Sequence, residues 1–197
     1  MQVSGGRLHA AGRNLRQVIH SPMTWIWVAA VLGMQALITI GGWPESLGEY
    51  YKNFGLSRAG FMSGRIWQLV THGLVHGGWW HAGLNALFIL LIGSRIEHMA
   101  GRSAVSAALW LGVFGGGLCH LLLGSGLLVG ISGGCFALLL LLATLSPESR
   151  MVPLMVSAKS LGIGLLLAEL LLALINPAVE LPGLSRIGEL LVDHGMG

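Results

Sequence analysis

Ser132, in the stretch GISGG (130–134), is a side chain that could act as a nucleophile. It stands near the start of an apolar run, 129–145. The flanking glycines allow a tight turn that exposes the hydroxyl and leaves backbone N–H groups free to bind a carbonyl oxygen. A plain helix cap is the alternative, because Ser and Gly are both common at helix N-termini. These few residues alone do not separate the two interpretations.

A second polar group lies in THGLVHGGWWHAGLNALF, 71–88. His81 and Asn85 are four residues apart, so on a helix they share one face. An imidazole and a carboxamide aimed at one point can donate hydrogen bonds to an oxyanion, and losing one such donor costs an enzyme about 10² to 10³ in rate. Interhelical hydrogen bonds that stabilise a bundle are the alternative. The spacing leaves both open.

We expect neither a metal nor a cofactor. The three histidines of this segment have no carboxylate at the HExxH spacing of metalloproteases: His72, His76 and His81. Cys119 and Cys135 lie in apolar stretches without metal-ligand spacing. The formal charge of +3 comes from scattered basic residues, so we expect no nucleic-acid partner.

The composition predicts a membrane protein that is all α-helical. The chain is 54% hydrophobic and 10% charged, with a mean hydropathy of +0.75, and backbone in lipid must form helices. We expect three parts: a cytoplasmic segment at 1–22, a membrane domain at 23–176 and an outer segment at 177–197. Five membrane-spanning helices are expected in the domain, at 23–43, 79–93, 103–123, 129–145 and 154–175.

The distribution of Lys and Arg favours a cytoplasmic N-terminus. That orientation places seven basic residues inside and four outside: Arg7, Arg13, Arg16, Arg95, Arg102, Arg150 and Lys159 against Lys52, Arg58, Arg65 and Arg186. The first 22 residues lack the apolar core and cleavage site of a signal peptide. The long first loop, 44–78, would then lie at the outer surface, on the same side as the start of the Ser132 helix.

Together these motifs resemble the rhomboid intramembrane serine proteases. The resemblance is close over about 64–150 and rests on the order and spacing of several residues: Trp67, His72, His76, His81, Asn85, Glu97, Gly101, Gly130 and Ser132. It implies a rhomboid-like bundle of six membrane helices, with the first loop partly in the membrane. It also implies a serine helix that starts below the outer surface in a water-filled cavity.

The resemblance implies roles for these residues. Ser132 would be the nucleophile, with His81, Asn85 and the backbone N–H groups of Ser132 and Gly133 as oxyanion donors. His76 would brace the loop, and further structural support would come from Trp67, Glu97 and Gly130. Single-span membrane proteins in the lipid bilayer would be the substrates. The expected location is the inner, cytoplasmic membrane, and the sequence does not give the oligomeric state.

Two positions depart from the family pattern. The family's base is a histidine on a sixth membrane helix, whereas this sequence offers His194 in VDHGMG with three residues after it. Either His194 is the base on a vestigial last turn, or the true base is missing with a truncated sixth helix, which we favour slightly. Gln68 stands where rhomboids commonly have Arg, which puts the anchoring of the loop in doubt.

Alternatives to this assignment stay open. His120 could serve as the base if the fold brings it to Ser132, although a structural hydrogen bond fits it better. Glu169, an acid within the fifth predicted span, is not expected to take part in the chemistry. If the base is missing, the protein would be a catalytically inactive rhomboid-like protein that binds membrane helices.

Overall fold

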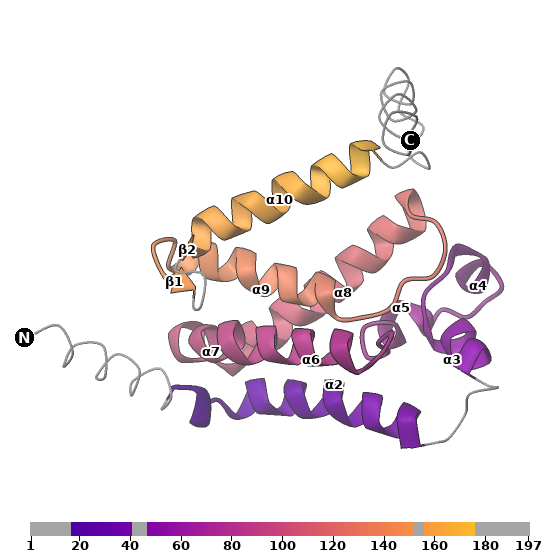
Figure 1. Ribbon diagram of the computed structural model, residues 1–197, viewed down its shortest axis with the longest axis horizontal. Helices are drawn as coiled ribbons and strands as arrows, with labels where there is room; N and C mark the ends of the chain where they lie inside the picture. The colour runs from indigo at the N-terminus through magenta and orange to yellow at the C-terminus, as the bar shows by residue number, and fades with distance from the viewer. Residues whose placement is uncertain (1–16, 41–46, 152–155, 176–197) are drawn as a thin grey trace, which may run out of the picture.

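The computed structural model describes residues 17–40, 47–151 and 156–175, and in these ranges the chain runs back and forth as a helical bundle (Figure 1). α9 lies in the middle of the view, between α10 and the α6–α7 run. In chain order the elements are α2 (Pro22–Ile40), α3 (Leu47–Phe54), α4 (Arg58–Met62), α5 (Gln68–Thr71), α6 (Trp79–Phe88), the π-helix η1 (Ile89–Gly93), α7 (Ser94–Ala100), α8 (Arg102–Leu123), α9 (Ser132–Leu145), β1 (Arg150–Met151), β2 (Val156–Ser157) and α10 (Ala158–Ile175).

The fold is mostly helical, as predicted. The structure differs from the all-helical prediction at the connection between α9 and α10. There β1 and β2 pair antiparallel, with Arg150 opposite Ser157. Two residues are too few to show the alternation that marks a strand in sequence.

The five predicted membrane spans are not confirmed. Within the described residues, two helices are long and apolar enough to cross a membrane, α2 and α8. α9 and the segment Ala158–Leu167 of α10 are apolar but shorter. The composition predicted apolar helices with few charges, which the structure has. It did not predict the length of each helix correctly.

The end predicted for the second span, Gly93, is wrong. Helix continues from Trp79 through η1 and α7 to Ala100, and the backbone at Gly93 is helical. Gly93 is a packing position, because a Cβ there would lie 3.2 Å from the hydroxyl of Thr24 on α2. The helix stops at Gly101, whose φ of +88° favours glycine.

Glu97 joins this end of the bundle to the start of α2. Its carboxylate accepts hydrogen bonds from the backbone N–H of Met23 (3.1 Å) and Thr24 (2.8 Å), and from the Thr24 hydroxyl (2.8 Å). The first N–H groups of a helix have no intrahelical partner, so the carboxylate satisfies them and complements the helix dipole. Arg102, the first residue of α8, lies 3.7 Å from the same carboxylate.

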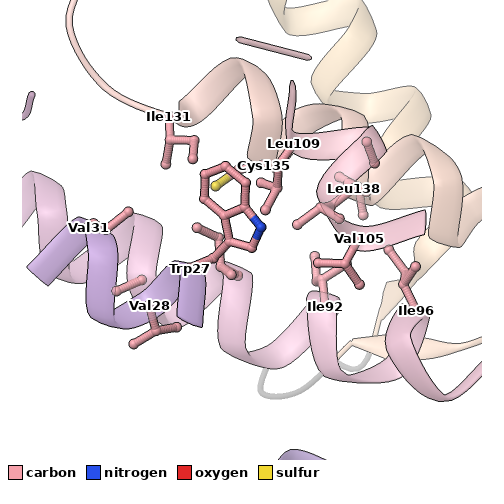
Figure 2. Packing of buried hydrophobic residues seen from close by; sticks show 14 of the residues in the cluster. Trp27, Val28, Val31, Ile92, Ile96, Val105, Leu109, Ile131, Cys135 and Leu138 are labelled. Atoms are coloured by element: carbon pink, nitrogen blue, oxygen red, sulfur yellow. The ribbon is translucent and has the colours of Figure 1, made fainter. Parts of the chain in front are cut away.

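The core is built around α9, whose apolar side chains meet those of α2, η1, α7 and α8 (Figure 2). Leu138, Leu139 and Leu142 are fully buried there. Trp27 of α2 packs edge-on against Trp110 of α8, with ring centroids 5.2 Å apart.

The backbones of α8 and α9 touch at glycines. A Cβ on Gly112 would contact the carbonyl oxygen of Gly133 and lie 2.6 Å from the Cα of Gly134. Small residues allow such an approach between membrane helices, where no hydrophobic force draws the helices together. Gly115, one turn along α8, has nothing within 4 Å of the same position.

The Gly112 contact predicts a difference between two alanine substitutions. We expect Gly112→Ala to destabilise the protein by about 1–3 kcal/mol, because the added methyl forces two backbones apart. Gly115→Ala should be neutral or stabilise by up to about 1 kcal/mol through helix propensity. Thermal unfolding in detergent micelles measures both. Equal melting temperatures for the two variants would contradict this account.

Candidate active site

Ser132 is the first residue of α9 and is exposed. The N-cap is Ile131, and the first backbone bond of the helix runs from the N–H of Cys135 to the carbonyl of Ile131 (3.0 Å). No side chain of the described residues caps this helix. The capping interpretation of Ser132 is therefore wrong, because its hydroxyl accepts no capping bond. The N–H groups of the first turn remain free to bind a ligand.

Ser132 borders a groove of about 1090 Å³. Asn85 and Gly130 line the same groove, and most of its remaining wall is apolar. The apolar lining comes from α6, η1, α8, α9 and α10 and includes Leu84, Leu87, Phe136, Leu161 and Leu165. The serine hydroxyl therefore opens onto a space large enough for an extended peptide segment.

His81 and Asn85 both approach Gly130, two residues before Ser132. A Cβ on Gly130 would lie 2.8 Å from Nε2 of His81 and 3.6 Å from Nδ2 of Asn85. Gly130 has a φ of +107°, so both its conformation and its surroundings require glycine. His81 and Asn85, which the spacing predicted to share one face of a helix, thus both lie against the loop that precedes Ser132.

Asn85 is 8% exposed, and its Nδ2 has no hydrogen-bond partner among the described residues. Its Oδ1 lies 3.7 Å from the sulfur of Cys135. The alternative role for this pair, hydrogen bonds that tie helices together, fits the Oδ1 contact with Cys135 but does not account for an Nδ2 without a partner. An unpartnered buried donor costs about 1–3 kcal/mol, and such groups gather where a ligand can bind.

The loop before Ser132 is fixed by backbone pairing with the α3–α4 connection. Leu56 and Leu128 exchange two hydrogen bonds, of 2.9 and 2.8 Å. The N–H of Gly130 donates to the carbonyl of His72 (2.8 Å). The segment that carries the serine is therefore held on two sides by residues of the long first loop.

His76 lies beneath His81. Their rings make an edge-to-face contact with centroids 5.1 Å apart, and Tyr51 donates its hydroxyl to the carbonyl of His76 (2.9 Å). Nδ1 of His76 is 3.2 Å from the carbonyl oxygen of Leu74, so Nδ1 carries the proton. His76 supports the ring of His81 from the loop side.

Two buried histidines of the loop are held neutral. Burial lowers the pKa of His76 to about 4, and the nearby His81 lowers it further, against the opposing hydrogen bond to Leu74. Burial also lowers the pKa of His72, although the hydrogen bond from its Nδ1 to the carbonyl of Gln68 (2.8 Å) opposes this.

Gln68 anchors the first loop in place of the expected arginine. It is fully buried, donates from Nε2 to the carbonyl of Lys52 (2.8 Å) and accepts from the N–H of Ser57 (3.3 Å). The doubt raised by this position is thereby resolved, since the amide serves as both donor and acceptor. Trp67 is half-exposed and donates from Nε1 to the carbonyl of Asn53 (3.0 Å), in the same loop.

Other predicted residues have their contacts elsewhere or fall outside the described residues. Glu97 is in α7, beside the start of α2. His120 packs its ring against Gly124 at the end of α8. His194 and the side chain of Glu169 fall outside the described residues.

The neutral state of His76 predicts a pH dependence of stability. Unfolded, the imidazole titrates near 6.5, and folded it titrates near 4. Because the unfolded state binds the proton first, stability is complete above pH 6.5 and falls as the pH drops towards 4, by up to about 3 kcal/mol. Melting temperatures of the parent and of His76→Asn at pH 7.5, 5.5 and 4.5 measure this. The melting temperature of the parent should fall more at low pH than that of the variant. Identical decreases would refute the assignment of a neutral His76.

Comparison with known proteins identifies the fold. The family described as Rhomboid domain matches residues 63–191. Rhomboid-like protein 16, chloroplastic, of Arabidopsis thaliana is 39% identical over 70 residues, which are 36% of this chain and 22% of that protein. The matched region thus spans about a fifth of that relative's length. No solved structure matches. The matched family covers more than half of the chain, and with its apolar helices the chain is a membrane protein that belongs to the rhomboid family.

Proposed function

We propose that this protein is an intramembrane serine endopeptidase, with Ser132 as the nucleophile. One observation carries the proposal: exposed Ser132 at the uncapped start of α9 shares a groove with Asn85, whose Nδ2 has no partner among the described residues. His81 lies against Gly130, two residues before Ser132. These are the groups that a tetrahedral oxyanion requires, placed beside a free alcohol.

The chemistry follows from these positions. Oγ of Ser132 attacks the scissile carbonyl carbon, its proton passes to a base, and the carbonyl oxygen becomes negative. His81, Nδ2 of Asn85 and the N–H groups of Ser132 and Gly133 donate to that oxygen, with the helix dipole adding to the attraction. Collapse of the intermediate expels the amine, which takes the proton from the base. Water then hydrolyses the ester on Ser132.

For the endopeptidase we propose His194 as the base, the histidine that follows α10 in the sequence, whereas a missing base, the alternative slightly favoured from the sequence, would leave a protein that binds without cleavage. A hydroxyl is a poor nucleophile until a neighbouring base accepts its proton. Removing either member of a serine–histidine unit abolishes most of the rate. His194→Asn therefore tests the base separately from the nucleophile.

The groove favours a membrane-embedded substrate. Its leucines from α6 and α10 would contact an apolar segment, and Ser132 lines the same groove. We propose single-span membrane proteins as substrates, cut in or beside the membrane segment. The proposed location is the inner, cytoplasmic membrane with the N-terminus in the cytoplasm, following the distribution of basic residues.

A second candidate function is the binding of membrane helices without cleavage. One observation favours it: among the described residues, no imidazole hydrogen-bonds the hydroxyl of Ser132. The same apolar groove would then hold a helix. Labelling of Ser132 by a fluorophosphonate separates the two functions, because a serine without a base does not react.

Ser132→Ala should abolish cleavage of a single-span reporter in proteoliposomes while leaving the melting temperature unchanged. His194→Asn should lower the rate at least 10³-fold, the order expected when the base of such a unit is lost. Ser125→Ala is the matched control, since Ser125 is an exposed serine in the loop that precedes α9. Reporter cleavage is read by gel. Equal rates for Ser132→Ala and the parent would exclude the mechanism, and an unchanged rate for His194→Asn would exclude that base.

Gly130→Ala should reduce fluorophosphonate labelling of Ser132 by more than tenfold, because the new methyl would occupy the place of the His81 ring. Gly126→Ala is the control. Gly126 also has a positive φ, of +79°, but a Cβ there meets nothing within 4 Å. The control therefore carries the backbone strain without displacing His81. Equal labelling of the two variants would show that His81 is not part of the site.

A further inference from the structure

We infer that Cys135 is a positioning residue, whose thiol fixes the orientation of the Asn85 amide. This inference rests on the proposed function. Cys135 lies on α9 three residues after Ser132, so it is one turn below the serine on the same face. It is 5% exposed and belongs to the core around Trp27 and Leu109 (Figure 2).

The geometry makes the thiol a donor to Asn85. Its sulfur lies 3.7 Å from Oδ1 and 3.8 Å from the main-chain oxygen of the same residue. An S–H group is a weak donor, and a carboxamide presents an acceptor on one side and two donor hydrogens on the other. The acceptor side of Asn85 therefore faces Cys135.

The consequence concerns the other half of the amide. With Oδ1 held by the thiol, Nδ2 is turned away from the core and towards Gly130, where it has no partner among the described residues. A flipped amide would remove the Oδ1 acceptor from the thiol, would leave NH₂ facing a sulfur that is only a weak acceptor, and would present an oxygen to the substrate. An oxygen there would repel the negative charge that forms in the reaction. The thiol thus selects the orientation that can donate.

Cys135 borders the groove but is 5% exposed, and in this proposal its effect on the reaction passes through Asn85. Such a contact should contribute to the rate and not to the binding of the substrate, because the oxyanion forms only in the transition state.

Infrared spectroscopy tests the contact directly. The chain has two cysteines, so in the Cys119→Ser protein Cys135 supplies the single S–H stretching band. Adding Asn85→Ala should move that band to higher frequency, because the thiol loses its Oδ1 acceptor. A band that stays at the same frequency overturns the inference. This readout does not require catalytic activity.

Kinetics test the effect on the reaction. Cys135→Val fills the space of the thiol with a slightly larger side chain that has no donor, Cys135→Ala loses both volume and donor, and Cys135→Ser keeps a donor. We expect kcat to fall about three- to tenfold in the Val and Ala variants, the order of one modest hydrogen bond, with KM unchanged and the Ser variant between them and the parent. In an Asn85→Ala background, Cys135→Val should cause no further loss. A Val variant as active as the parent, with only Ala impaired, would show a packing role and overturn the inference.

Failure of the proposed function gives a different result. If the parent neither cleaves the reporter nor reacts with the fluorophosphonate while the infrared band shifts, the endopeptidase assignment is wrong and the contact stands. If the parent cleaves and the band does not shift, the positioning role is wrong and the endopeptidase assignment stands.

Discussion

The backbone contact between α8 and α9 at Gly112 and Gly133 determines where the candidate site lies. Because neither residue has a side chain, the first turn of α9 can rest directly on α8. Ser132 immediately precedes that contact. A larger residue at either position would move the start of α9, and with it the serine, relative to α6.

The first loop completes the positioning from the other side. Its pairing between Leu56 and Leu128, and the bond from Gly130 to His72, hold the chain that leads into Ser132. Gln68 in turn fixes the loop through its buried amide. Backbone groups inside a bundle must find partners, and here they find them between segments distant in sequence. The same bonds that satisfy the loop therefore shape the site.

The polar groups in this bundle that bear on the site differ in whether they have partners. The carboxylate of Glu97 and the amide of Gln68 have their partners, and they tie elements together. Nδ2 of Asn85 and the first turn of α9 do not, and both lie at the groove. Unpartnered donors in a buried place are costly, so their convergence beside an exposed hydroxyl is the feature that separates a reactive site from a structural one.

The sequence by itself determined the helical class and the grouping of the chemistry. Lipid forces backbone into helices, and the four-residue spacing of His81 and Asn85 places them on one face whatever the surroundings. Only the tertiary structure decided that Gly93 continues a helix, that Gly112 and not Gly115 is a contact, and that Cys135 faces Asn85. Those outcomes depend on which side chain or backbone lies opposite in another helix. The periodicity of a sequence predicts which face of its own helix a residue occupies. It does not predict which residue of another helix that face will contact.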